Sequence, residues 1–274
     1  MEPTLLTPEG IPAQPGKFLQ VLRKHPLLNY FLLAYAISWL LSIPFILSEW
    51  GILHGDYKVW FVLKGFGPFL SAYILSWAIA GKSGTKGLRD QMRKRKAAWP
   101  WFVLVLVVIP LLLILGILAQ PGSTLNFKGL SPILLASYPL TYAAVFFGGG
   151  PLGEEPGWRG FALPRLQQKF GALVGTLILG VLWTCWHLPD FLTSAQGGGP
   201  GTGLNTFLQN FPIFLALVMS FAVLLTWIYN KNNGSIFLAL LAHASINTPQ
   251  VVLVPLFPAV TTTFDKIPWF NYDL

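Results

Sequence analysis

Three short segments of this chain hold side chains that could do acid–base chemistry, and each lies in or beside an apolar stretch. The first runs from Gly153 to Gly160 and contains two adjacent glutamates, the second from Trp183 to Pro189, and the third from His243 to Asn247. Ionisable groups in apolar segments are costly to bury and are often functional. Carboxylate, imidazole and amide groups are those with which a hydrolase activates water and holds a developing oxyanion.

The spacing of the first segment gives its two glutamates different roles. If a helix begins here, with Pro156 in its first turn, Glu155 and Arg159 are four residues apart on one face and form an ion pair. Glu154 then points elsewhere and is free to face a cavity, where it has no cation beside it and suits a general base. A negatively charged helix N-terminus without a catalytic role is the structural alternative.

Distances along the chain place the polar groups at one level. If Gly171 is the turn of a helical hairpin, Glu154 lies 17 residues before it and His187 lies 16 residues after it, so both stand about 25 Å from the turn. His243 lies about 14 Å inside the last apolar stretch, and Asn247 is one turn further on the same face. We therefore expect these four side chains to line one cavity, although His187 could instead cap a broken helix and the other two could join helices by hydrogen bonds.

The elements that must position these groups are membrane-spanning helices. Of the 274 residues, 54% are hydrophobic and only 10% are charged, whereas about a quarter are charged in an average soluble domain. A soluble enzyme is therefore excluded. Seven stretches are apolar over the roughly 20 residues that a spanning helix needs: 27–48, 59–80, 99–119, 130–152, 170–189, 207–230 and 234–256.

These stretches predict an all-α fold, a polytopic membrane helix bundle that forms one domain. We expect 1–26 to be a cytoplasmic N-terminal segment, 27–264 to be the transmembrane bundle and 265–274 to be a C-terminal tail. Within the predicted spans Lys64 is the only Lys or Arg. It either snorkels to the surface or makes a polar contact inside the bundle.

Basic residues gather on one side of the predicted spans. Seven lie between Gly81 and Ala98, and the segment before the fifth span adds Arg159, Arg165 and Lys169, whereas the opposite loops and the tail carry only Lys58, Lys128 and Lys266. The positive-inside rule then puts the N-terminus in the cytoplasm. The membrane is expected to be the plasma membrane of the cell.

The same topology accounts for the net charge of +8. The run from Arg93 to Lys96 fits a loop that faces anionic lipid, so no nucleic-acid partner is expected. A single cysteine, Cys185, excludes an internal disulfide and a zinc site built from several cysteines. The oligomeric state is not determined by these features.

The three segments together resemble the motifs of the CPBP family, which includes the CAAX prenyl endopeptidases of the Rce type and bacteriocin-processing or abortive-infection (Abi) membrane proteins. The resemblance covers about residues 130–255 and rests on Glu154-Glu155-x-x-x-Arg159, Trp183-x-x-x-His187 and His243-x-x-x-Asn247. The family pattern usually has Phe at the position of Trp183. The resemblance implies an intramembrane endopeptidase, and it raises the expected bundle to seven to eight transmembrane helices, with 154–169 as the additional one.

Two mechanisms fit these residues. In the first, Glu154 aided by His187 deprotonates a water molecule, while His243 and Asn247 donate hydrogen bonds to the tetrahedral oxygen. In the second, Glu154, His187 and His243 bind Zn²⁺, as the family name "metalloprotease" suggests, with water in the fourth position. Asn247 favours the metal-free mechanism, because an amide suits an oxyanion better than zinc. Glu155, Arg159 and Trp183 would support either site.

The resemblance implies a membrane-associated peptide or protein as substrate, either CAAX-like or similar to a bacteriocin or leader peptide. The rival function is a non-enzymatic polytopic transporter, or a bacteriocin-immunity or binding protein, that uses the same polar cluster. Broken, glycine-rich helices beside buried polar groups also occur in transporters. Those often contain internal repeats, and none is visible in this sequence.

Overall fold

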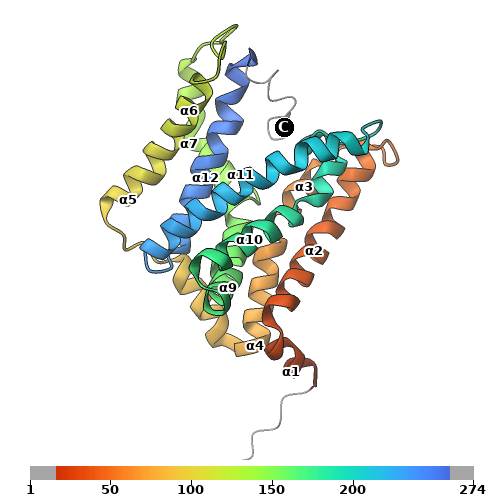
Figure 1. The fold of residues 1–274 in the computed structure, drawn as a ribbon, viewed down its shortest axis with the longest axis vertical. Helices are drawn as coiled ribbons and strands as arrows, with labels where there is room; N and C mark the ends of the chain where they lie inside the picture. The colour runs from red at the N-terminus through yellow and green to blue at the C-terminus, as the bar shows by residue number, and fades with distance from the viewer. Residues whose placement is uncertain (1–16, 260–274) are drawn as a thin grey trace, which may run out of the picture.

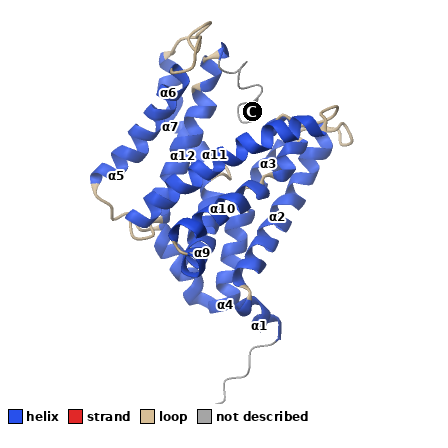
Figure 2. Cartoon of the chain, viewed as in Figure 1, coloured by secondary structure: helices blue, strands red, loops and turns tan. Residues whose placement is uncertain are grey.

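All of the regular secondary structure in the described chain is helical. The computed structural model describes residues 17–259, and within that range no strand is present (Figure 2). The prediction of an all-α fold is confirmed. The helices are α1 (Lys17–Lys24), α2 (Pro26–Glu49), α3 (Lys58–Lys64), α4 (Gly67–Met92), α5 (Trp99–Val103), α6 (Ile109–Leu118), α7 (Pro132–Phe147), α8 (Pro151–Gly157), α9 (Leu163–Phe170), α10 (Ala172–Trp186), α11 (Leu204–Lys231) and α12 (Ile236–Val252).

Helical segments long and apolar enough to cross a membrane number six within residues 17–259. A seventh results if the bent pair Pro132–Phe147 and Pro151–Phe170, which meet at 41°, is one broken span. The protein is therefore an integral membrane helix bundle, and its count reaches the lower end of the predicted seven to eight. The six are Pro26–Glu49, Lys58–Met92, Trp99–Leu118, Ala172–Leu192, Leu204–Lys231 and Ile236–Leu256.

Two predicted spans, 59–80 and 130–152, are not continuous helices. The first is broken between α3 and α4, and the second ends at Phe147, before three consecutive glycines. The two breaks pack against each other, because a Cβ on Gly65 would stand 2.2 Å from the carbonyl oxygen of Gly149. A Cβ on Gly153 would likewise stand 2.3 Å from the carbonyl oxygen of Gly65. Glycines at these positions thus allow two backbones to approach more closely than any side chain permits.

The helix that carries the glutamates begins earlier than predicted. Pro151, rather than Pro156, occupies its first turn, and Pro156 lies inside α8. Proline is suited to the first turn because its missing N–H has no helical partner there. Past Pro156 the backbone continues as a π-helical turn, Trp158–Ala162, and then as α9. The predicted distortion of this helix is therefore present, and the predicted turn at Gly171 is confirmed between α9 and α10.

The bundle surrounds α12, which Figure 1 shows in blue between the edge formed by α5 and α6 and the rest of the molecule. In the most apolar segment of the span that contains α12, 72% of the residues are buried, against 17% for the span formed by α5 and α6. In the hairpin of α9 and α10, α10 packs against α11, while α8 and its π-helical continuation pack against α4. The catalytic candidates of α8, α10 and α12 therefore come from the interior of the bundle.

One basic residue was assigned to the wrong environment. Arg159, which we expected on the charged side with Arg165 and Lys169, is completely buried. Its partner Glu155 lies one turn earlier on the same buried face, so Arg159 points into the bundle. The predicted limits of the N-terminal segment and of the C-terminal tail with Lys266 stay predictions, because residues 1–16 and 260–274 lie outside the described part.

Candidate active site

Glu154 lies on α8 with its side chain directed at two indole rings. Its Oε2 accepts hydrogen bonds from Nε1 of Trp183 at 2.6 Å and from Nε1 of Trp158 at 3.2 Å. Among residues 17–259 it forms no ion pair. It keeps 6% of its surface exposed, whereas Glu155 has 0%. As the spacing predicted, Glu154 is the carboxylate without a cation.

Glu155 joins two helices through a single oxygen. Its Oε1 accepts hydrogen bonds from Nη1 of Arg159 at 2.8 Å and from Nδ1 of His243 on α12 at 2.8 Å. The ion pair with Arg159 was predicted, but the bond to His243 was not. Because an ionised carboxylate can only accept, the proton of His243 on this side is on Nδ1. Glu155 therefore orients a candidate catalytic histidine as well as neutralising Arg159.

Hydrogen-bonding capacity remains around this ion pair. In the described structure, Oε2 of Glu155, Nε and Nη2 of Arg159 and the hydroxyl of Tyr30 are buried without a hydrogen-bond partner. Tyr30 is close, because a Cβ on Gly157 would stand 2.3 Å from its hydroxyl oxygen. Buried polar groups in proteins are nearly always satisfied by protein or by water. The site is therefore suited to hold water or a polar part of a ligand.

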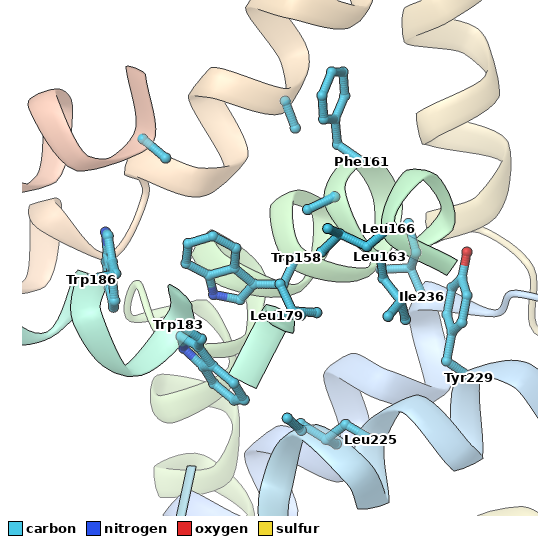
Figure 3. Close-up of a cluster of buried hydrophobic side chains, with 14 of the residues drawn as sticks. Trp158, Phe161, Leu163, Leu166, Leu179, Trp183, Trp186, Leu225, Tyr229 and Ile236 are labelled. Atoms are coloured by element: carbon cyan, nitrogen blue, oxygen red, sulfur yellow. The ribbon is translucent and has the colours of Figure 1, made fainter. Parts of the chain in front are cut away.

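Aromatic rings enclose the carboxylates. Figure 3 shows Trp158, on the π-helical continuation of α8, close to Trp183 and Trp186 of α10. Trp158 meets Trp186 edge-on, with ring centroids 5.8 Å apart, and Trp183 meets His243 in the same way at 5.5 Å. The guanidinium of Arg159 lies 4.7 Å from the centre of the Trp183 ring. Trp183 was predicted as a supporting aromatic wall, and its indole N–H adds a donor that a Phe would lack.

Asn247 lies beside the first turn of α8. Its amide nitrogen is 3.6 Å from the point where a Cβ on Gly150 would stand, and the carbonyl of Gly150 accepts the backbone N–H of Glu154 at 2.9 Å. His243, one turn earlier on α12, binds Glu155. The structure therefore brings Glu154, His243 and Asn247 to one junction, between α8 and α12.

His187 belongs to a second cluster. It occupies the C-cap position of α10, as one structural alternative proposed. Its Nδ1 is 2.8 Å from Oδ2 of Asp190, and the other oxygen of Asp190 binds the ammonium of Lys64. Glu154 is hydrogen-bonded to Trp183, which lies one helical turn before His187. A π-helical turn rises less per residue than an α-helix, so a count at α-helical rise overestimates how far Glu154 lies from Gly171.

Two hydrogen-bond partners, Asp190 and Trp158, were not predicted, although their spacing from His187 and Glu154 signals both. Lys64 makes a polar contact inside the bundle, which was one of the two readings given for it. Asp190 follows His187 by three residues, a spacing at which side chains meet along a helix. Trp158 follows Glu154 by four residues and was signalled in the same way.

The predicted zinc ligands do not form a metal site as they stand. In the part of the chain from 17 to 259, no group of three or more His, Cys, Asp or Glu side chains is arranged to hold a metal ion. Oε2 of Glu154 accepts two indole N–H groups, and Nδ1 of each histidine faces a different carboxylate. The second mechanism therefore finds no support in this geometry.

Comparisons with known proteins agree on one class. A family model described as "Type II CAAX prenyl endopeptidase Rce1-like" matches residues 135–249, the range that holds the three motifs. The CAAX prenyl protease 2 of Methanococcus maripaludis is 24% identical over 244 residues, which cover 82% of this chain and 83% of that protein. The similarity thus extends well beyond the motifs.

Proposed function

Because the chain is an intramembrane endopeptidase of the CPBP family, to which the Rce-type CAAX prenyl endopeptidases belong, we propose that it uses water activated by Glu154 to cleave a membrane-anchored protein near its C-terminus. The observation that carries this proposal is the contrast between the two glutamates: Glu155 is bound to a cation, whereas Glu154 is held only by indole N–H groups. The match to the Rce1-like family model and the similarity to a CAAX prenyl protease 2 support an endopeptidase over the alternative of a transporter or immunity protein.

Glu154 has the environment that a general base needs. Two indole donors fix Oε2, so the carboxylate is oriented without being neutralised. In residues 17–259 no hydrogen bond reaches Oε1, which remains available to a water molecule. A base placed within hydrogen-bond reach contributes about 10²- to 10⁴-fold to the rate. In the proposed step, Glu154 takes one proton from water while the oxygen attacks the peptide carbonyl carbon.

His243 and Asn247 are the proposed donors to the tetrahedral oxygen. Nδ1 of His243 is engaged by Glu155, so donation toward substrate falls to Nε2 and requires a doubly protonated ring. Asn247 supplies a neutral amide donor one turn away on the same helix. The proton held by Glu154 then passes to the leaving amine.

An apolar groove leads to this junction. It encloses about 530 Å³ between α4, α7 and α12. Its wall includes Leu152, three residues before Glu155, and Leu240, three residues before His243, so the groove adjoins both elements of the site. Arg89, Arg93 and Arg95 lie at the same groove. This lining fits a substrate segment that is mostly apolar. The substrate would enter from the side of the three arginines, which we propose is the cytoplasmic face of the plasma membrane.

The test is cleavage by the purified protein in liposomes. Two peptides of identical sequence, one with a prenylated cysteine near its C-terminus and one without, are incubated with wild type and with Glu154→Gln, and the products are identified by mass spectrometry. We expect the wild type to release a short C-terminal peptide from the prenylated substrate and the variant to release none. A leader-type peptide, offered in parallel, tests the alternative substrate class.

The matched control is Asp90→Asn, which removes an exposed carboxylate and should cleave like wild type. Equal product from wild type and Glu154→Gln would contradict the role of Glu154. No product from any of the three peptides, with the wild type folded and inserted, would contradict the proposed substrate.

A further inference from the structure

A second buried ionic cluster lies outside the proposed reaction centre. Lys64 from α3 binds one carboxylate oxygen of Asp190, and the other oxygen faces Nδ1 of His187 at 2.8 Å. The side chains of Lys64 and Asp190 are 6% and 3% exposed, and that of His187 is 18% exposed. The cation and the carboxylate are thus enclosed, and the histidine is the member of the cluster that solvent reaches.

Stability alone does not explain this cluster. Taking two charges out of water costs several kcal/mol per ion, and replacing a buried ion pair by apolar residues of similar size is often neutral or stabilising. Ionisable groups inside a membrane protein usually serve a function. Nothing in the mechanism described above uses either Lys64 or Asp190.

The reaction centre contains the same order of groups. There a cation, Arg159, binds a carboxylate, Glu155, which binds Nδ1 of a histidine, His243. In that cluster too, the cation and the carboxylate are enclosed and the histidine is the most exposed member, with side-chain exposures of 0%, 0% and 6%. Two cation–carboxylate–histidine clusters are therefore built alike from different helices.

Indole rings connect the two clusters. The ring of His187 contacts the ring of Trp186, with centroids 4.6 Å apart, and Trp186 contacts Trp158 at 5.8 Å. Nε1 of Trp158 donates to Glu154. Lys64 also lies over Trp186, 4.9 Å from its ring centre. The second cluster is therefore packed directly against the wall of the reaction centre.

We propose that Asp190, anchored by Lys64, is a positioning residue that holds the proton of His187 on Nδ1 and leaves the lone pair of Nε2 as a hydrogen-bond acceptor. The carboxylate of Asp190 can only accept, so Nδ1 must donate. Lys64 occupies the other oxygen of Asp190, so the carboxylate presents a single oxygen to the ring of His187. This inference rests on the proposed function together with the sequence-based expectation that His187 assists Glu154 in deprotonating water.

The first measurement is the nitrogen NMR spectrum of protein labelled with ¹⁵N-histidine, in which a His187→Gln spectrum identifies the signals. In the wild type we expect a protonated Nδ1 and an unprotonated Nε2. In Lys64→Met the charge of Asp190 is unmatched, so we expect both nitrogens to be protonated. An unprotonated Nδ1 in the wild type would overturn the inference, and that result needs no variant to fold.

The second measurement is peptide cleavage. Lys64→Met should lower kcat about 10- to 100-fold, the usual cost of losing a group that orients a catalytic residue, with KM little changed. The double variant Lys64→Met/Asp190→Asn has no net charge and retains an amide oxygen to accept from Nδ1, so kcat should recover. A structural role predicts the opposite order, because the double variant removes more of the cluster.

The matched control is an exposed pair of the same chemistry. Lys86 and Asp90 are 2.7 Å apart with side chains 70% and 55% exposed, and Lys86→Met should change neither kcat nor the histidine spectrum. Absence of recovery in the folded double variant would overturn the inference. If the wild type cleaved no peptide, the proposed function would fail, and the nitrogen spectrum would still decide the position of the proton on His187.

Discussion

In a soluble protein the more apolar helix is usually the more buried one, and two spans of this protein show the reverse. The span Trp99–Leu118, which contains α5 and α6, has a mean hydropathy of 3.2 and only 17% of its window is buried. The span Ile236–Leu256, which contains α12, has a mean hydropathy of 1.5 and 72% of its window is buried. The less apolar helix is therefore the central one.

The difference teaches what drives helix position in a bilayer. Lipid tails solvate an apolar side chain as well as the protein interior does, so a strongly hydrophobic helix gains little by moving inward. Polar side chains gain hydrogen bonds inside, and small residues permit close packing. α12 carries His243, Ser245 and Asn247, and α8, which packs against it, carries the glutamates. The polar interior of the bundle consequently holds the candidate active site.

The largest effect is expected at the boundary between α8 and α12. Glu154→Gln removes the proposed general base and should lower kcat by about 10³-fold or more, with little change in thermal stability because glutamine also accepts from Trp158 and Trp183. Peptide cleavage and thermal unfolding in detergent measure the two quantities. A variant that lost activity and stability together would point to a structural role for Glu154.

The second effect separates stability from chemistry at the neighbouring residue. Arg159→Ala leaves Glu155 as an uncompensated buried charge and should destabilise the protein by about 3–5 kcal/mol. Glu155→Ala should also lower stability and release His243. The free energy of unfolding of both variants is measured and compared with that of Lys86→Met, a substitution at an exposed site. A loss below about 1 kcal/mol would mean that water replaces the missing partner.

A pair of leucine substitutions tests the comparison directly. Leu238 on α12 is 0% exposed and Leu112 on α6 is 59% exposed. Leu238→Ala should cost about 2–5 kcal/mol because it opens a cavity, whereas Leu112→Ala, which faces lipid, should change stability by less than about 0.5 kcal/mol. Equal losses would show that α6 contributes a buried face in the membrane.

Asn247 tests whether the polar face of α12 takes part in the reaction. Asn247→Ala removes a proposed oxyanion donor and should lower kcat about 10²-fold while KM stays nearly constant. Ser220→Ala on α11, an exposed polar residue in a span, is the control and should behave like wild type. A change confined to KM would assign Asn247 to substrate binding instead.

The smallest effect is expected from removing metal. The proposed mechanism uses Glu154 without a metal ion, so dialysis against a strong zinc chelator should leave kcat within about twofold of its starting value. The chelated protein is assayed with and without added Zn²⁺. Loss of activity that Zn²⁺ restores would instead support the second mechanism, in which metal polarises water.

Much of the candidate site follows from the sequence because a helix fixes local neighbours. The pairing of Glu155 with Arg159 and the freedom of Glu154 from a cation both follow from the four-residue repeat. The apolar stretches predict the membrane bundle because only hydrogen-bonded helices or closed barrels cross a bilayer. Glycines around 148–157 indicate a broken helix, and the structure has that break.

Only the tertiary structure decided which distant groups meet. Glu155 and His243 are 88 residues apart, and Lys64 and Asp190 are 126 residues apart. These contacts depend on how α3, α8 and α12 pack, which in turn depends on the close approach of Gly65, Gly149 and Gly153. The sequence by itself therefore determined the residues, the membrane setting and the local pairs. Packing decided that His243 meets Glu155 and that Lys64 meets Asp190, because helix periodicity carries no information about which faces of separate helices come together.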